Sequence, residues 1–246
     1  MKTIKFMVIV SVVFIAVLAT INEVTKARIE QNFEIEQAKS MLYAFNIFPE
    51  GYSEDQMAST NVTADIPWKE GEVLQVLQTR LEKMSVPIPE SLQNDLKGTF
   101  LEGQTSLEVY AGKNEQGEVS AYGLPLYGKG LWGTIEGFGV VSSDLKTMIG
   151  IDFTKQVETP GLGARIIEKE YKYFFRNLDL IGFFETITGQ KPVIMVKDKE
   201  QTNVESSTNS VEAVTGATQT SQGVLDMINS NFAVYLKILQ AYKEQA

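Results

Sequence analysis

The sequence has 246 residues, with no cysteine and no histidine, and its 31 acidic and 22 basic residues give a formal net charge of -9. The lack of thiols and imidazoles excludes disulfides, iron–sulfur clusters, most haem and zinc sites, and catalytic pairs of a hydroxyl or thiol with histidine. The acidic balance argues against nucleic acid as a partner, and any redox chemistry is expected to come from an organic cofactor.

The first element is an uncharged, almost wholly apolar run over residues 6–21. A membrane-spanning helix needs about 17–25 residues, and the flanking Ile4 and Val24 extend the run to that length. A cleaved signal peptide is the alternative, but no small-x-small pattern follows Ala19, so we expect an uncleaved anchor over residues 1–24. Basic residues flank the run on both sides, and the charge count alone leaves its orientation open.

An amphipathic helix is predicted from about Thr25 to Asn46, within a juxtamembrane segment over residues 25–50 that continues the anchor outward. Its charged face is either solvated or docked on a partner protein. Residues 51–246 have the length of one domain. No cation-ligand spacing such as Asp-x-Asp occurs, so we expect no metal site.

Within this domain, an apolar stripe predicts a helix over residues 70–84, which Pro87 stops. Short runs rich in β-branched and aromatic residues, separated by turn signals, then predict an antiparallel meander. The predicted strands span residues 106–111, 119–126, 130–142 and 147–155. A helix over 164–175, a strand over 192–197 and a polar loop over 205–209 follow. The fold class is α+β, a mostly antiparallel sheet backed by helices, with one N-terminal transmembrane helix.

Residues 211–221 place several hydroxyls and one glycine directly before an apolar-periodic run that predicts a helix from Gln222 onward. Free N–H groups and the positive end of the dipole at a helix N-terminus favour an anion such as phosphate, and Gly216 lets the backbone come close to it. The alternative is simple capping by Thr218, Thr220 or Ser221.

Residues 215–218, Thr-Gly-Ala-Thr, resemble the flavinylation motif of a known family of FMN-binding domains. The family comprises NqrC, the FMN-binding subunit of the sodium-translocating NADH:quinone reductase (Nqr), and RnfG, the corresponding subunit of the related Rnf electron transport complex. Residues 158–163, Glu-Thr-Pro-Gly-Leu-Gly, and the Gly-Leu-Trp element at 130–132 resemble segments of the same family, and they precede Thr218 in the expected order. Where the family motif begins with Asp, this chain has Glu212.

The resemblance implies FMN bound covalently through a phosphodiester to the Thr218 hydroxyl. It implies that Glu212, Thr215, Gly216 and Ala217 shape the attachment site. It also implies that three residues of the second motif border the cofactor: Thr159, Gly161 and Leu162. From the residues alone, that motif is a turn in which Pro160 fixes φ and the glycines permit positive φ or close approach. Trp132 is either a core aromatic on a strand, which burial statistics favour, or part of a wall beside the flavin.

By resemblance, the chain is a membrane-anchored subunit of an ion-translocating NADH:quinone reductase that relays electrons and has no catalytic residues of its own. Its expected partners are the other membrane subunits and a flavin transferase. The expected location is the bacterial cell membrane, with the soluble domain on the non-cytoplasmic side. The alternatives are the RnfG subunit of a ferredoxin:NAD oxidoreductase, or a non-redox membrane-tethered assembly protein whose threonine loop only caps a helix.

Overall fold

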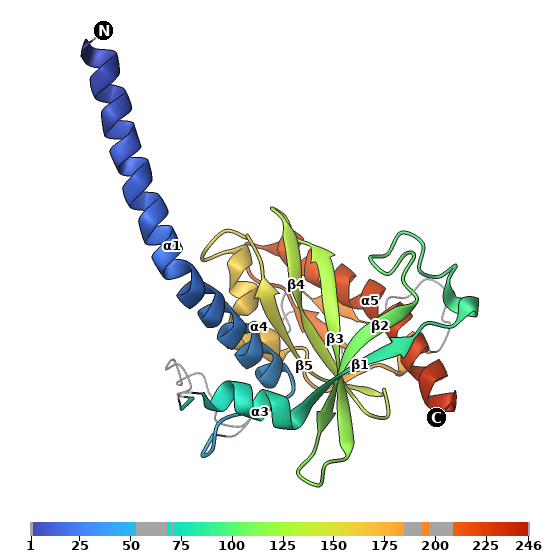
Figure 1. Ribbon diagram of the computed structural model, residues 1–246. Coiled ribbons are helices and arrows are strands. Elements are labelled where there is room, and N and C mark those ends of the chain that lie inside the picture. Colours follow the sequence, from blue (N-terminus) through green and yellow to red (C-terminus); the bar gives the residue numbers. More distant parts are fainter. Residues whose placement is uncertain (1, 53–67, 70, 185–192, 197–208, 246) are drawn as a thin grey trace.

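The computed structural model describes residues 2–52, 68–69, 71–184, 193–196 and 209–245. The anchor and the amphipathic segment form one continuous helix, α1, Lys2–Ala44. Its N-terminal half projects away from the rest of the molecule (Figure 1), and its apolar side chains there are exposed. One helix of the described chain is long and apolar enough to cross a membrane, and that helix is α1. These features fit a membrane anchor.

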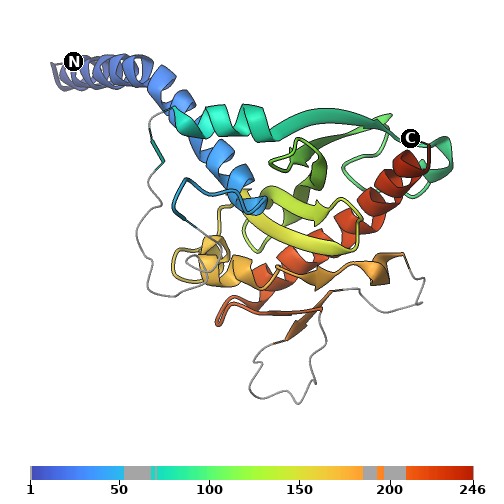
Figure 2. The same cartoon turned by 90° about the horizontal axis from the view of Figure 1, so that it is seen from below.

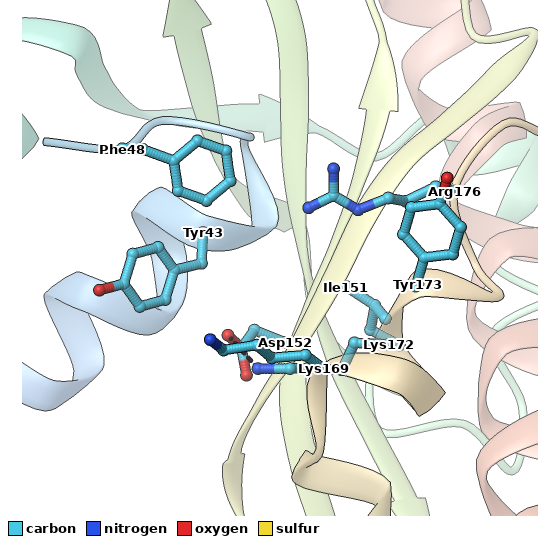
Figure 3. Close-up of a pocket in the computed structure, with 8 residues that line it drawn as sticks. All are labelled: Tyr43, Phe48, Ile151, Asp152, Lys169, Lys172, Tyr173 and Arg176. Atoms are coloured by element: carbon cyan, nitrogen blue, oxygen red, sulfur yellow. Dashed lines mark hydrogen bonds and ion pairs between the residues drawn. The ribbon is translucent and has the colours of Figure 1, made fainter. Parts of the chain in front are cut away.

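The last turns of α1 belong to the globular domain. Leu42 and Ala44 are fully buried, and the Phe45 ring lies against Gly112 and Gly123. Figure 3 shows Tyr43 and Phe48 facing the short helix α4, Lys169–Tyr173, across a small pocket. The boundary between a juxtamembrane segment and the domain at residue 50 stays a prediction, since α1 contributes to both.

A six-stranded antiparallel meander in the order β1-β2-β3-β4-β5-β6 forms the centre of the domain. The sequence predicts its four central strands, between residues 106 and 155, but not the two outer strands. Its strands are β1 Leu81–Pro87, β2 Ser106–Lys113, β3 Val119–Lys129, β4 Thr134–Ser142, β5 Thr147–Lys155 and β6 Leu178–Asp179. A separate parallel pair joins β7, Ile194–Val196, to β8, Ser210–Glu212. The predicted polar loop at 205–209 lies outside the described residues except for Asn209. The α+β class with a sheet backed by helices is confirmed.

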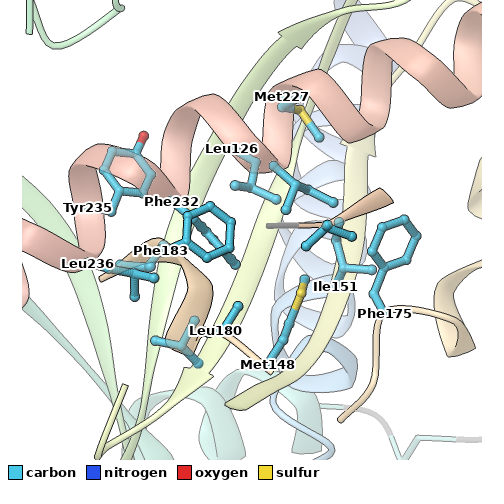
Figure 4. Close-up of a cluster of buried hydrophobic side chains, with 14 of the residues drawn as sticks. Leu126, Met148, Ile151, Phe175, Leu180, Phe183, Met227, Phe232, Tyr235 and Leu236 are labelled. Carbon is cyan, nitrogen blue, oxygen red and sulfur yellow. The ribbon is translucent and has the colours of Figure 1, made fainter. Parts of the chain in front are cut away.

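The two faces of the sheet are covered by different helices (Figure 2). The end of α1 and α3, Glu72–Arg80, form one apolar cluster with Ala121 and Val140. On the other face lies α5, Thr218–Gln245, whose Phe232 and Leu236 pack with Leu126 and Met148 (Figure 4). Side chains that alternate along β3 therefore serve two cores, because successive residues of a strand point to opposite faces.

The predicted helix over residues 70–84 is wrong in its last part, because the chain is already extended at Leu81 and continues as β1. Leu81 and Val73 belong to the same apolar cluster, so the helical spacing continues past the helix end without a helix. The conformation of residues 81–87 is decided by pairing of β1 with β2, which runs from Leu81 opposite Gly112 to Pro87 opposite Ser106. Tertiary pairing here overrides the local pattern.

The predicted helix over residues 164–175 is also wrong as a single element. It divides into the 3-10 turn η2, Gly163–Ile167, and the short helix α4, Lys169–Tyr173, separated by an extended Glu168. The apolar residues on which the prediction depends are nevertheless buried: Ile166, Tyr171 and Phe175. Two short helical turns bury them without one continuous helix. The remaining 3-10 turns are η1, Glu90–Leu92, and η3, Ile181–Phe183.

Candidate functional site

Three segments that are distant in sequence meet at one end of the sheet (Figure 1). They are the β3–β4 hairpin loop at residues 130–133, the loop after β5 at residues 156–163, and the start of α5. An added Cβ at Gly223, in the second turn of α5, would collide with the carbonyl oxygen of Lys129. The absence of a side chain at Gly223 thus lets α5 approach the hairpin at backbone distance.

The hairpin loop carries two exposed apolar side chains. The N–H of Gly130 donates to the carbonyl of Gly133 at 2.8 Å and closes the loop, which carries the exposed Leu131 and Trp132. Strand β4 starts only at Thr134, after this loop. Trp132 is 69% exposed, so its assignment to the core is wrong.

The loop after β5 is a tight turn. The carbonyl of Thr159 accepts hydrogen bonds from the N–H groups of Leu162 and Ala164, both at 3.1 Å. Gly161 has a φ of 75°, and Gly163 is packed closely against Thr220 and Glu158, so both glycines are required as the sequence predicts. Thr159, Gly161 and Leu162 are exposed at the surface of this turn.

A second turn leads directly into α5. The N–H of Ala217 donates to the carbonyl of Val214 at 2.9 Å, and Gly216 has a φ of 79°. A Cβ at Gly216 would lie 3.2 Å from Cδ2 of Leu162, so this turn touches the loop after β5. Helix α5 begins at Thr218 itself, and Thr218 is the first residue of its first turn.

The hydroxyls of this region have different surroundings. Thr220 is buried and donates to Oε2 of Glu158 at 2.6 Å. Ser221 is buried, donates to the carbonyl of Ala217 and accepts from the N–H of Val214. Thr218 and Thr215 are exposed, and neither hydroxyl makes a hydrogen bond within the described part of the chain. No hydroxyl accepts from a first-turn N–H there, so the capping interpretation is wrong.

The start of α5 fits a phosphate group. Within the described residues, the backbone N–H groups of Thr218, Gln219 and Thr220 have no hydrogen-bond acceptor, whereas the next one, of Ser221, donates to Ala217. Such unpaired donors, together with the positive end of the dipole of a long helix, favour an anion. The exposed hydroxyl of Thr218 lies on the first residue of this helix, next to these donors in the sequence.

The surface beside this helix end fits a flat apolar ring. Four large apolar side chains are exposed on the hairpin and the loop after β5: Leu131, Trp132, Val157 and Leu162. Val157 packs on Gly133, and Leu162 lies against Gly216, so these side chains belong to segments that touch one another. Exposed apolar groups gathered beside an anion site are the surface that an aromatic ring with a phosphate tail requires.

The other predicted residues occupy the supporting part of this region. Glu212 is half-buried and ends β8, where it pairs with Val196 of β7. Ala217 is buried beneath the turn, whereas Thr215 and Gly216 are exposed on it. The segment that connects β8 to the start of α5 thus contains Glu212 and residues 215–218.

Glu158 lies at the centre of this region, although nothing in its local sequence predicts a role for it. It is only 5% exposed, and its carboxylate joins the hairpin to α5. Its partner Thr220 is 62 residues away in the sequence, so no local periodicity reveals the contact. The one available signal is an acidic residue directly before the Thr-Pro-Gly turn.

The pocket between α1 and α4 (Figure 3) is a different place. Its volume is about 70 Å³, far below the ~300–1,000 Å³ of ligand pockets, and no residue of the three segments lines it. Asp152 in its wall is buried and accepts a hydrogen bond of 2.9 Å from Lys172. Burial raises the pKa of Asp152, and the Lys172 ammonium opposes that rise.

Comparison with known proteins indicates an FMN-binding domain in this part of the chain. Residues 130–232 match the family model described as the FMN-binding domain, and this range contains all three segments. The match supports FMN as the cofactor of the domain. The match begins at the hairpin loop and ends in the middle of α5.

NqrC, a subunit of the Na(+)-translocating NADH-quinone reductase, recurs among the relatives. NqrC from Pasteurella multocida is 34% identical over 146 residues, 59% of this chain and 51% of that protein. NqrC from Yersinia pestis is 31% identical over 53% of this chain and 48% of that protein. The chain thus spans about half the length of the curated relatives it matches. The resemblance indicated by the sequence motifs is confirmed.

Two solved structures share the fold. NqrC from Parabacteroides distasonis superposes with a TM-score of 0.62 at 23% identity, covering 87% of this chain and 96% of that one. NqrC from Shewanella oneidensis superposes with a TM-score of 0.58 at 17% identity, covering 86% of this chain and 99% of that one. At these identities the likeness concerns the fold alone.

Proposed function

We propose that this chain is a membrane-anchored flavoprotein subunit that relays electrons through FMN held covalently on Thr218. The observation that carries the proposal is the exposed, unbonded hydroxyl of Thr218 on the first residue of α5, beside three backbone N–H groups without an acceptor among the described residues. Bound FMN supplies the redox chemistry, since its ring system accepts and gives up electrons. The protein supplies position and electrostatics.

Attachment is a substitution at phosphorus. The Thr218 oxygen forms a new P–O ester bond to the FMN phosphorus of an activated flavin nucleotide. The phosphoanhydride bond of that nucleotide breaks, its second phosphate group leaves with the bonding electron pair, and the hydroxyl proton passes to a base of the transferase or to water. A threonine hydroxyl is a weak nucleophile, and no histidine exists in the chain to activate it, so a flavin transferase is the expected partner in maturation. Buried Thr220 and Ser221 are already hydrogen-bonded, which favours Thr218 as the acceptor.

The surrounding residues have distinct proposed roles. Glu212, Thr215, Gly216 and Ala217 shape the attachment turn, and the N–H groups at the start of α5 hold the phosphate. Thr159, Gly161 and Leu162 border the cofactor, with Trp132 of the hairpin loop. Their surface is open, so the ring stays accessible to a redox partner.

The complex is proposed from the relatives, which are named as subunits of the Na(+)-translocating NADH-quinone reductase. We assign the chain to an NADH:quinone reductase of this type, together with other membrane subunits. The soluble domain is assigned to the non-cytoplasmic side, where a covalent cofactor cannot dissociate into surroundings poor in free FMN.

Co-expression of the full-length chain with a flavin transferase tests the covalent cofactor. The purified protein is expected to be yellow, to carry an FMN-sized mass increment, and to keep its fluorescence in the denatured band of a gel. The same chain expressed without the transferase is the control and should lack the increment. A colourless protein of unmodified mass from the co-expression would reject the proposal and favour a non-redox assembly protein.

Two further measurements address the setting. Protease added to intact spheroplasts should digest the soluble domain, whereas protection until lysis would place it inside the cell. Proteins that copurify in mild detergent should be the other subunits of an NADH:quinone reductase. Recovery of a ferredoxin:NAD oxidoreductase complex would assign the chain to the Rnf type.

A further inference from the structure

Glu158 is a buried carboxylate with two donors from different segments. Its Oε1 accepts the backbone N–H of Trp132 at 3.0 Å, and its Oε2 accepts the Thr220 hydroxyl at 2.6 Å. Its own N–H donates to Oε1 of Gln156 at 2.6 Å. One side chain therefore connects the hairpin loop, the loop after β5, and the first turn of α5.

The surrounding glycines leave room for this carboxylate. A Cβ added at Gly130 would collide with Oε1 of Glu158. A Cβ added at Gly163 would lie 2.6 Å from the Thr220 hydroxyl and 2.8 Å from Oε2 of Glu158. Both positions accept only glycine without a shift of neighbouring atoms, and both belong to the motif segments.

We infer that Glu158 is the positioning residue of the flavin site, which holds exposed Trp132 and exposed Thr218 in a fixed relation. The inference rests on the proposed function. Thr218 lies two residues before Thr220 in the same helical turn, and Trp132 is held through its own backbone N–H. A single carboxylate thereby sets where the ring surface lies relative to the attachment oxygen.

A carboxylate suits this place because it only accepts hydrogen bonds, and both of its partners here donate them. Its negative charge near the start of α5 also interacts favourably with the helix dipole. Replacement by alanine leaves the Trp132 N–H and the buried Thr220 hydroxyl without an acceptor. Glutamine keeps both contacts, since its oxygen accepts from Trp132 and its amide donates to the Thr220 oxygen.

The test compares Glu158→Ala and Glu158→Gln in the full-length chain, co-expressed with a flavin transferase. The readouts are the initial rate of FMN attachment by intact mass and the visible circular dichroism of bound FMN. For Glu158→Ala we expect attachment to slow about tenfold, the effect of leaving a buried donor unpaired, and the flavin dichroism to be lost. Glu158→Gln should restore both.

Glu168→Ala is the matched control. Glu168 lies ten positions further along the chain, after η2, in an exposed pair with Arg165 at 3.0 Å, and its removal should change neither readout. Wild-type attachment rate and dichroism in Glu158→Ala would overturn the inference. Wild-type protein that takes up no FMN would instead reject the proposed function itself, so the two failures are distinguishable.

Two softer variants decide the matter if Glu158→Ala does not fold. Thr220→Val removes only the donor to Oε2, and Gly163→Ala pushes on the same pair without touching the flavin surface. Both should still carry FMN at the end point, with altered flavin dichroism. Unaltered dichroism in both folded variants would overturn the inference.

Discussion

The Thr220 hydroxyl donates a 2.6 Å hydrogen bond to the carboxylate of Glu158 across 62 residues of sequence. This contact ties the start of α5 to the loop after β5 and occupies Thr220. With Ser221 also engaged, Thr218 is the exposed hydroxyl in the first turn of α5. Of the hydroxyls in this turn, the fold therefore leaves that of Thr218 open to the proposed attachment.

Thr218→Val is expected to abolish covalent flavin and leave the fold intact, because valine keeps the shape but removes the oxygen nucleophile. Intact-mass measurement after co-expression with a transferase checks this. Thr220→Val is the control, since the Thr220 hydroxyl is buried and already donates to Glu158, and it should keep the FMN increment at the end point. An FMN increment on Thr218→Val would refute the assignment.

Gly161→Val should lower electron transfer more than FMN attachment. Gly161 has a φ of 75° with no atom near its missing Cβ, so valine adds backbone strain of about 1–2 kcal/mol without a clash. Gly117→Val is the control, since Gly117 has a φ of 82° in equally open space in the β2–β3 turn. We expect both variants to lose similar amounts of thermal stability. Only Gly161→Val should also change the turnover and the redox potential of the flavin. Unchanged turnover and potential would make the loop a mere connector.

Phe45→Ala should cost about 3–5 kcal/mol of unfolding free energy, the usual effect of removing a buried aromatic ring. Phe45 is 8% exposed, and its ring occupies the space above Gly112 and Gly123. Phe33→Ala is the control. Phe33 lies on α1, twelve residues before Phe45, and is 56% exposed, so its loss should change stability by less than about 0.5 kcal/mol. Urea unfolding of a fragment lacking the anchor measures both, and equal costs would contradict the packing of Phe45.

A fragment beginning at Thr25 should be soluble without detergent and folded, because it lacks the apolar run but keeps the buried end of α1. A fragment beginning at Ile47 should not fold, since it also lacks Leu42, Ala44 and Phe45 of the core cluster. Gel filtration and circular dichroism distinguish the two. A stable, folded Ile47 fragment would show that the helix end is dispensable.

Stability should depend on pH through Asp152, whose pKa burial raises above its ordinary value. Between the ordinary and the raised pKa, the folded state keeps a proton that the unfolded state has lost, so stability falls as pH rises through this window. Asp152→Asn should lack that decline, whereas Asp95→Asn, which alters an exposed pair with Lys237, should keep it. The unfolding free energies of wild type and Asp152→Asn are measured from about pH 4 upward. Equal pH dependence in the two proteins would contradict the role of Asp152.

Local sequence patterns predict much of this molecule correctly. The apolar run over residues 6–21, the four central strands of the meander and the turn glycine Gly161 all follow from composition, periodicity and turn chemistry. These features depend on neighbours in the chain, which is why a single sequence reveals them. The helix predicted through residue 84 fails at Leu81, where pairing with β2 outweighs the helical spacing.

The sequence by itself determined the anchor, the class of fold and the motifs at residues 130–132, 158–163 and 215–218. Only the tertiary structure decided that Trp132 is exposed, that Thr220 is occupied, and that Glu158 joins the three segments. Exposure and pairing of a side chain depend on atoms that the chain brings together from distant positions. Residue spacing along one sequence carries no record of those distances.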